Sequence, residues 1–471
     1  MSMFNPIILM SRIVHYSETK AVNKHKNMAI RTYGMSFLSR WQSALHSVLR
    51  QQDEKVSDCL SSEHDAMAAS CEACANLEAA ITEGNESVDI AEVVTKGSLA
   101  SKCAHLYVSL ATAKFSGNGE RARELESEIR YSVCDPLWAK TLLEFDNNHQ
   151  EIPYRHYESL DDFVLPLSGD ETNHESEKLK IAFVSDWATG TPLAKNVMRC
   201  IGEQNPDIVI HLGDVYYSGT KEEMRNHFLS IVREYLPKHT RVFNLAGNHD
   251  LYAGGAGYYW LLDELGQPAS YFCLRNQHWQ ILSIGAPPQV GKPIDAISAI
   301  PAIEPKEVTW HQHKMNTADG RKTVMLSHYQ LFTSSGNIGR TKDNRPLALN
   351  PVLYDAFQAH LPDIDLWLWG HEHNLVAFEP YAGLRKGRCI GSGAIPVALL
   401  WQPYKQLPNL ALPEQFNAAP KINLDCQLGH DGDHYHHAFG VLNIDGAHGE
   451  MNYFQVEGVD GDATVIYSES L

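Results

Sequence analysis

Five short stretches of the sequence carry carboxylate, amide and imidazole side chains directly after apolar runs. They are Asp186; Gly213-Asp214-Val215-Tyr216-Tyr217; Gly247-Asn248-His249-Asp250; Ser327-His328; and Gly370-His371-Glu372-His373. Hard oxygen donors combined with imidazoles suit Mn, Fe or Zn ions. The glycines permit sharp backbone turns beside these side chains. The residue types therefore predict a metal centre, with Asp214 as a carboxylate that bridges two ions.

Each of these stretches follows a run with β-strand character. The strands expected before them span residues 180–185, 208–212, 241–245, 323–326 and 366–369. Helices are expected between the first three, at 192–204 and 221–235. This alternation indicates βαβ units and a sheet covered by helices, in which ligands collect at the carboxyl ends of the strands. We therefore expect all five stretches to lie on one rim.

Further strands are expected later in the chain, at 279–284, 388–390, 439–444 and 451–456, the last two around a turn at Asp445. A helical stretch near Trp310 is expected to present His311 and His313 on its surface. These elements would complete a mixed α/β fold.

The first third of the chain has a different pattern. Apolar residues with helical spacing between residues 28 and 145 predict about five helices, and no catalytic constellation stands out among them. Residues 168–178 are polar and acidic without periodicity, which is typical of a linker. We therefore expect a helical N-terminal domain (1–166), a linker (167–178) and a catalytic domain (179–471). The helical domain would be a scaffold, or would bind a partner or restrict substrate access.

The composition excludes several classes of protein. The chain has 471 residues and a formal net charge of −18, which argues against a duplex nucleic-acid partner. No apolar run approaches the ~20 residues that span a bilayer, and the short apolar run at 6–10 lacks the basic segment of a signal peptide. Nine scattered cysteines, including Cys71 and Cys74, are typical of reduced thiols. We expect a cytoplasmic protein, and export without a signal stays open.

The five stretches, in this order, resemble the calcineurin-like metallophosphoesterases over residues 178–400. The resemblance implies a four-layer β-sandwich flanked by helices, with two metal ions at the carboxyl rim of the sheets. It also implies which residues bind each ion. The first ion would be held by Asp186, Asp214 and His373, and the second by Asp214, Asn248, His328 and His371.

One position departs from the commonest family pattern, in which the first stretch reads Asp-x-His. Here Trp187 and Ala188 follow Asp186, so the first ion loses an imidazole. The spacing from Asp214 to Tyr217 is similar to that of the purple acid phosphatases, in which a tyrosinate ligates a ferric ion. A free tyrosine has a pKa of about 10, so a phenolate at neutral pH needs a strongly Lewis-acidic neighbour. The resemblance implies Fe(III) with Fe(II), Zn or Mn, or alternatively two Mn(II) ions if Tyr217 only packs.

The implied activity is hydrolysis of phosphate esters by a hydroxide that two metal ions activate. His249 would lie beside the substrate and protonate the leaving oxygen, and Asp250 would fix the tautomer of His249. Asn248 and His249 would also bind the substrate. Arg340, in the glycine-rich segment 334–340, is a further candidate for binding its phosphate.

Several alternatives stay open at this point. A phosphomonoesterase acting on a small molecule or a phosphoprotein is favoured. The alternatives are a phosphodiesterase for a cyclic nucleotide or another diester, and a partner-binding regulatory protein with weak or vestigial activity. A dense cluster of histidines, namely His430, His434, His436 and His437, would form a second metal site, or would border the active site or simply pack.

Overall fold

The computed structural model describes residues 110, 113–114, 116–119, 154–168, 178–285 and 303–471, except 337, 340, 344, 398, 400, 401 and 433. The chain divides into two compact units, Met1–Asn147 and Asn148–Leu471. In the first unit, the described residues around Ala113 are helical, and a turn follows at Gly117, where the sequence pattern predicts a helix end. The other helices expected between residues 28 and 145 lie outside the described residues.

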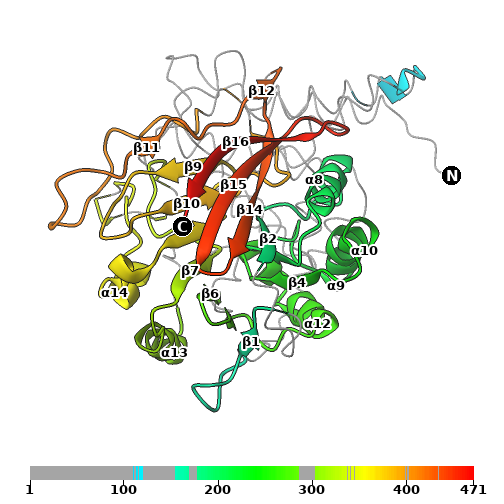
Figure 1. Cartoon of the computed structure of the whole chain (residues 1–471). Coiled ribbons are helices and arrows are strands. Elements are labelled where there is room, and N and C mark those ends of the chain that lie inside the picture. The colour runs from blue at the N-terminus through cyan, green and yellow to red at the C-terminus, as the bar shows by residue number, and fades with distance from the viewer. Residues whose placement is uncertain are drawn as a thin grey trace, which may run out of the picture. The chain divides into compact units, whose positions relative to one another are not determined.

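Two β-sheets form the centre of the second unit (Figure 1). The larger sheet has eight strands in the order β1-β5-β6-β7-β8-β10-β9-β11. Its strands are β1 (Val164–Pro166), β5 (Phe272–Arg275), β6 (Trp279–Ser283), β7 (Lys322–Ser327), β8 (Leu366–Trp369), β9 (Leu375–Phe378), β10 (Gly387–Ile390) and β11 (Ile422–Asn423).

The smaller sheet has six strands in the order β16-β15-β14-β2-β3-β4. Its strands are β2 (Lys178–Val184), β3 (Ile208–His211), β4 (Arg241–Asn244), β14 (His437–Asp445), β15 (His448–Val456) and β16 (Ala463–Ser470). β2, β3 and β4 run parallel to one another, and β14 pairs antiparallel with β2. A separate two-stranded ladder joins β12 (His430–Asp431) and β13 (His434–Tyr435).

Side chains alternate between the two faces of each central strand, as the period of two in a strand requires. In β2, Ile181 and Phe183 join a core that also contains residues of the larger sheet, such as Leu326, so the two sheets pack face to face. Ala182 and Val184 of β2 point the other way and pack against helices. β2 is therefore buried on both faces.

Helices cover the outer faces of the two sheets. Those on the side of the smaller sheet are α8 (Pro192–Glu203), α9 (Lys221–Glu223), which contacts α12 and η1, the π-helical η1 (Met224–Leu229), α10 (Ser230–Tyr235), α11 (Asn248–Leu251) and α12 (Ala256–Leu265). Those beside the larger sheet are α13 (Pro305–Asn316), α14 (Pro351–Phe357) and the short 3-10 helix η3 (Leu361–Asp363). Figure 1 shows α13 and α14 on one side of the sheets and α8 to α12 on the other. The four-layer α/β sandwich expected from the sequence is confirmed.

The expected strands and the expected helices at 192–204 and 221–235 all form, with bounds that differ by up to three residues. The surface position expected for His311 is wrong. His311 is fully buried, and its Nε2 lies 3.1 Å from Oε1 of Glu307, one turn earlier in α13. Both faces of this helix carry polar residues, so its spacing did not reveal the buried face.

The second unit begins earlier in the chain than the catalytic domain expected from the sequence. β1 pairs in parallel with β5, with Leu165 opposite Leu274. Leu167 is buried in the core between the sheets. Residues 154–167 therefore pack as part of the second unit, although the sequence analysis assigned them to the helical domain and the start of the linker. A strand of three residues at the edge of a sheet leaves almost no periodicity to detect.

Of the helices that the structure describes, none has the length and apolarity needed to cross a membrane.

Candidate metal centre

The loops that follow β2, β3, β4, β7 and β8 meet at one rim of the sandwich. Parallel neighbours such as β2 and β3, or β7 and β8, end at the same edge of their sheet, so the residues after them lie close together. These residues are Asp186, Asp214, Asn248, His328, His371 and His373. His371 is partly buried and the other five are buried. The expected common rim is confirmed.

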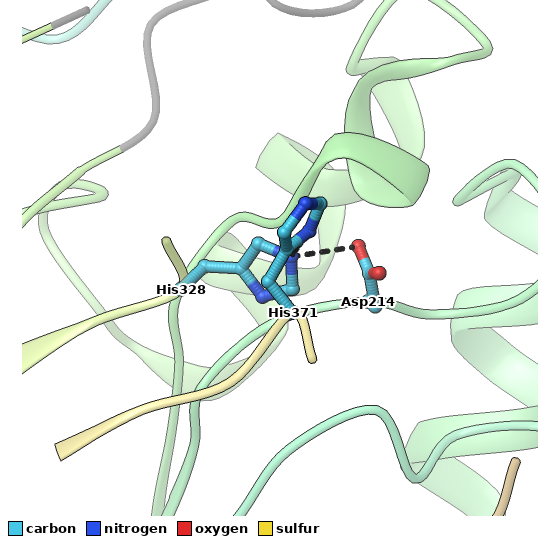
Figure 2. Close-up of side chains that lie close together, drawn as sticks. All are labelled: Asp214, His328 and His371. Carbon is cyan, nitrogen blue, oxygen red and sulfur yellow. Dashed lines mark hydrogen bonds and ion pairs between the residues drawn. The ribbon is translucent and has the colours of Figure 1, made fainter. Parts of the chain in front are cut away.

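Two groups of side chains at this rim are arranged so that each could hold a metal ion. One consists of Asp214, His328 and His371, and the other of Asp186, Asp214 and His373. Within each group, the ligand atoms all lie within 4.8 Å of one another. Figure 2 shows the two imidazoles of the first of these groups beside the carboxylate of Asp214. Asp214 belongs to both groups, which is the position of a bridging carboxylate.

His328 is at the middle of the histidine-rich group. Its Nε2 lies 3.5 Å from Oδ1 of Asp214, 3.1 Å from Nδ1 of His371 and 3.2 Å from Oδ1 of Asn248. Four potential ligand side chains therefore converge on a single point. This convergence matches the ligand set that the family resemblance implies for the second ion.

Hydrogen bonds behind this group orient its ligand atoms. Nδ1 of His328 donates to the carbonyl oxygen of Leu212 at 2.9 Å. This bond places the ring proton on Nδ1, so Nε2 has a free lone pair, as a metal-ligating imidazole needs. Nδ2 of Asn248 donates to the hydroxyl of Tyr252 at 2.7 Å, which turns Oδ1 of Asn248 toward His328.

The other group contains a phenol. The hydroxyl of Tyr216 lies 3.0 Å from Oδ1 of Asp186, 3.3 Å from Oδ2 of Asp214 and 3.1 Å from Nε2 of His373. Nε2 of His373 is in turn 3.3 Å from Oδ1 of Asp186. Four polar atoms thus surround one small space, and one of them is a tyrosine oxygen.

The tyrosine at this point is not the residue expected from the sequence. Tyr217, the expected ligand, contributes main-chain atoms to the surrounding loop. Its amide donates to Oε1 of Glu223 at 2.5 Å, and its carbonyl oxygen accepts from Nδ1 of His249 at 2.6 Å. The geometry therefore favours Tyr216 over Tyr217 as the phenol beside the carboxylates.

His249 and Asp250 do not form the pair expected from the sequence. Nδ1 of His249 donates to the carbonyl oxygen of Tyr217, and its Nε2 lies 3.9 Å from Oδ2 of Asp214. Oδ2 of Asp250 accepts from the amides of Asp214 and Gly247, each at 2.7 Å. A main-chain carbonyl therefore orients the imidazole, while Asp250 holds the loop that carries Asp214.

The rim concentrates buried negative charge. Burial and the nearby carboxylates of Asp186 and Asp250 raise the pKa of Asp214 well above its usual range. Burial alone would also raise the pKa of Asp186, but the hydrogen bond and the charge of His373 lower it below the usual value. Buried carboxylates that repel one another favour the binding of a cation among them.

Comparisons with known proteins extend this description. The sequence model of the calcineurin-like phosphoesterase family matches residues 179–375, which include every side chain of the two groups. Residues 179–375 are therefore similar to a calcineurin-like phosphoesterase domain, and we call this region the phosphoesterase domain. A comparison with curated protein sequences found no significant match.

The comparison with solved structures found matches of low sequence identity, and the following three have TM-scores below 0.5. One is GAP50, titled the anchor in the inner membrane complex of Plasmodium, with 15% identity over 62% of this chain and 88% of that chain, and a TM-score of 0.40. A second is PhoD, with 11% identity over 62% of this chain and 69% of that chain, and a TM-score of 0.43. A third is Vps29 of Cryptosporidium parvum, with 12% identity over 62% and 98% of the two chains, and a TM-score of 0.29.

The phosphoesterase domain holds several of its rim residues in an unusual backbone conformation. Asp186, Asp214 and His371 have positive φ angles of 54°, 75° and 65°. Left-handed backbone at residues other than glycine costs about 1–3 kcal/mol each and tends to cluster at functional sites. A methyl group added at Gly247 would collide with Oδ1 of Asp214, so this glycine permits close approach of two loops.

The buried carboxylate of Glu372 was not predicted as part of the site. Glu372 lies between His371 and His373, and its Oε1 accepts from the hydroxyls of Thr333 and Ser335, the latter at 2.5 Å. Glu372 therefore ties the loop after β7 to the loop after β8. Its place inside the Gly-His-Glu-His stretch was the signal in the sequence.

The remaining candidates stand apart from the two groups. Arg340 lies outside the described residues. In the histidine cluster, His430 and His434 are exposed on the β12–β13 ladder, and His437 is buried, with Nδ1 donating to the carbonyl oxygen of Ser392 at 3.1 Å. Neither metal-ligand group found in the described part of the chain includes a residue of this cluster.

Proposed function

We propose that the phosphoesterase domain hydrolyses phosphate esters, with monoesters favoured, and that it does so with two metal ions held by the two side-chain groups. The observation that carries this proposal is the place of Asp214 in both groups, whose ligand atoms lie within 4.8 Å of one another. A carboxylate shared in this way is the arrangement by which two ions are held close together. The family of residues 179–375 supports the same reaction class.

The donor set fits such ions. Carboxylate, imidazole and amide donors suit Mn, Fe and Zn, and the hydrogen bonds to Leu212 and Tyr252 orient the donors for binding. When bound, a pair of ions supplies Lewis-acid stabilisation of phosphoryl oxygens and a water of lowered pKa. The phenol of Tyr216 in one group favours Fe(III) there, with Fe(II), Zn or Mn in the other group. Two Mn(II) ions are the alternative.

The side chains around the two groups would bind and orient the substrate. The amide of Asn248 and the imidazole of His249 border the ligand atoms, and Nε2 of His249 faces the carboxylate of Asp214. Because Nδ1 of His249 is committed to the carbonyl of Tyr217, Nε2 is the atom that would hydrogen-bond a phosphoryl or leaving oxygen. Asp250 would act on this reaction only by holding the loop of Asp214 in place.

The test is an assay of the purified full-length chain, with its metals counted, on p-nitrophenyl phosphate beside bis-p-nitrophenyl phosphate. We expect faster hydrolysis of the monoester. Asp214→Asn should lose bound metal and about 10³-fold or more in kcat/KM, comparable to the loss of a major electrostatic stabiliser. Asp319→Asn is the matched control, because Asp319 is exposed and also has a positive φ, which asparagine tolerates.

Two results would contradict parts of the proposal. Protein loaded with Fe, Mn or Zn that hydrolyses neither ester would contradict phosphoesterase activity altogether. A preference for the bis-ester would contradict the monoester assignment and indicate a diesterase. Visible charge-transfer absorption in the iron-loaded protein would support a phenolate ligand.

A further inference from the structure

Tyr329 has a buried hydroxyl with no hydrogen-bond partner among the residues that the structure describes. The residue follows His328 in the chain and is only 7% exposed. An unpaired buried hydroxyl destabilises the folded state, and such groups in folded proteins generally meet a water, an ion or a ligand. We therefore expect the hydroxyl of Tyr329 to contact a water, an ion or a ligand that is not one of the described protein residues.

The ring of Tyr329 lies against the histidine-rich half of the metal centre. Its centroid is 4.9 Å from that of His371 and 5.0 Å from that of His328. Burial, followed by the charge of Asp214, raises the pKa of Tyr329 well above its usual range, so the hydroxyl is within electrostatic reach of the shared carboxylate. The unpaired hydroxyl of Tyr329 therefore lies at the edge of the group formed by Asp214, His328 and His371.

A phenol at neutral pH is a hydrogen-bond donor, because its ordinary pKa is about 10. The proposed reaction brings an anionic phosphoryl group to the place where His328, His371 and Asn248 converge. Hydrogen bonds to charged acceptors are stronger than those to neutral ones. A buried water would need two to four polar partners of its own, whereas a phosphoryl oxygen would also be attracted by cations that the two groups would hold.

We propose that the hydroxyl of Tyr329 donates a hydrogen bond to an oxygen of the phosphoryl group bound at the His328–His371 half of the centre. Tyr329 then contributes to the binding of both the phosphate ester and the phosphate product. This inference rests on the proposed phosphoesterase function and adds a residue that recognises the phosphoryl group. It needs no change in the protonation of Tyr329.

The test removes a single oxygen with Tyr329→Phe in the full-length, metal-loaded chain. The control is Tyr381→Phe, because the hydroxyl of Tyr381 is also buried without a partner among the described residues. The ring of Tyr381 packs on Phe332 and Phe416, in the core beside the outer face of the larger sheet. Binding of inorganic phosphate is measured by calorimetry, and its inhibition constant is measured against p-nitrophenyl phosphate.

We expect Tyr329→Phe to weaken phosphate binding about 10–100-fold and to raise KM in proportion, with metal content unchanged. Tyr381→Phe should bind phosphate as the unmodified protein does. Equal phosphate affinity in Tyr329→Phe would overturn the inference, and so would a weaker affinity that merely follows a loss of metal from the same sample. If the unmodified protein neither binds phosphate nor hydrolyses an ester, the proposed function fails instead.

Discussion

The hydroxyl of Tyr216 lies 3.0 Å from Oδ1 of Asp186. Tyr216 lies in the loop after β3, and Asp186 lies in the loop after β2. Their contact places a phenol in the group that lacks the histidine of the usual Asp-x-His pattern. Ala188 occupies that position here. The phenol therefore supplies a polar atom to a group that the sequence pattern alone leaves incomplete.

Substitution of the two adjacent tyrosines distinguishes their roles. Tyr216→Phe should abolish any visible charge-transfer absorption of the iron-loaded protein and lower kcat/KM by about 10²-fold, since one polar contact of the centre disappears. Tyr217→Phe should retain both, because the hydroxyl that lies beside the carboxylates belongs to Tyr216. Absorption spectra and metal counts on the two variants check this. The reverse result would assign the phenol ligand to Tyr217.

A methyl group at Gly247 should displace the metal-ligand side chain of Asp214. The added carbon would collide with Oδ1 of Asp214, so the loops after β3 and β4 would have to separate. We expect Gly247→Ala to weaken metal binding at least about tenfold, as losses of supporting contacts around metal ligands do. Competition with a chelator measures the affinity. Gly119→Ala is the control, because nothing lies within 4 Å of the added carbon there, and equal metal affinity in both variants would contradict the expectation.

A buried ion pair joins the two sheets. Nη2 of Arg388 in β10 lies 2.7 Å from Oε2 of Glu469 in β16, and both side chains are less than 10% exposed. Glu469→Gln should lower the free energy of unfolding by about 3–5 kcal/mol, because it leaves a buried guanidinium without its counter-charge. The double substitution with Arg388→Met should cost less than the sum of the two single ones.

Urea unfolding of the two single variants and the double variant measures this coupling. The exposed pair Arg233–Glu264, at 3.4 Å, serves as the comparison and should contribute about 0–1 kcal/mol. Additive effects of the Arg388 and Glu469 substitutions would show that the two side chains stabilise the domain independently.

His211 should make the stability of the metal-free protein depend on pH. Burial lowers the pKa of His211 to about 4, and its Nδ1 lies 2.6 Å from Oδ1 of Asn244. An unfolded histidine has a pKa of about 6.5, so below this pH the unfolded state binds a proton that the folded state does not. The stability that His211 contributes is complete above pH 6.5 and is lost as the pH falls toward 4.

The expected loss between pH 7.5 and pH 5 is about 2 kcal/mol for this histidine. Chemical unfolding at the two pH values in the presence of a chelator measures it. His211→Gln should show a smaller drop than the unmodified protein, and His239→Gln, at an exposed position, should show the same drop. An unchanged drop in His211→Gln would mean that His211 does not titrate differently on folding.

Much of the rim was predictable from the sequence for a local reason. Asp186, Asp214 and His328 each come two residues after the end of an apolar run, and an apolar run ended by polar residues marks both a buried strand and its carboxyl end. Because β2, β3 and β4 are parallel, knowing where each strand ends is enough to place the residues after them on the same edge. The sequence pattern was therefore enough to predict which edge of the sheet carries the metal-ligand side chains.

Side-chain direction within the loops was not predictable in the same way. Tyr216 and Tyr217 are chemically alike, and only the path of the loop decides which hydroxyl reaches Asp186. His249 and Asp250 are adjacent in the sequence, but both lie in α11, where successive side chains point about 100° apart. Adjacency in the sequence is thus a poor guide to contact, and long-range partners such as Tyr216 and His373 leave no mark in local spacing.

The position of β14 has a consequence for how the protein assembles as it is made. β14 is the first of the three C-terminal strands in the smaller sheet. It pairs along β2, the first strand of the phosphoesterase domain, and Val441 lies opposite Ala182. Asp186 lies just beyond the end of β2, so the strand that supports the earliest-made ligand is synthesised after all of the metal-ligand residues. Pairings between distant segments form slowly and late because a long loop must close first. The nascent chain therefore carries its metal-binding residues before β14 can hold them in place, and metal capture should follow the emergence of β14.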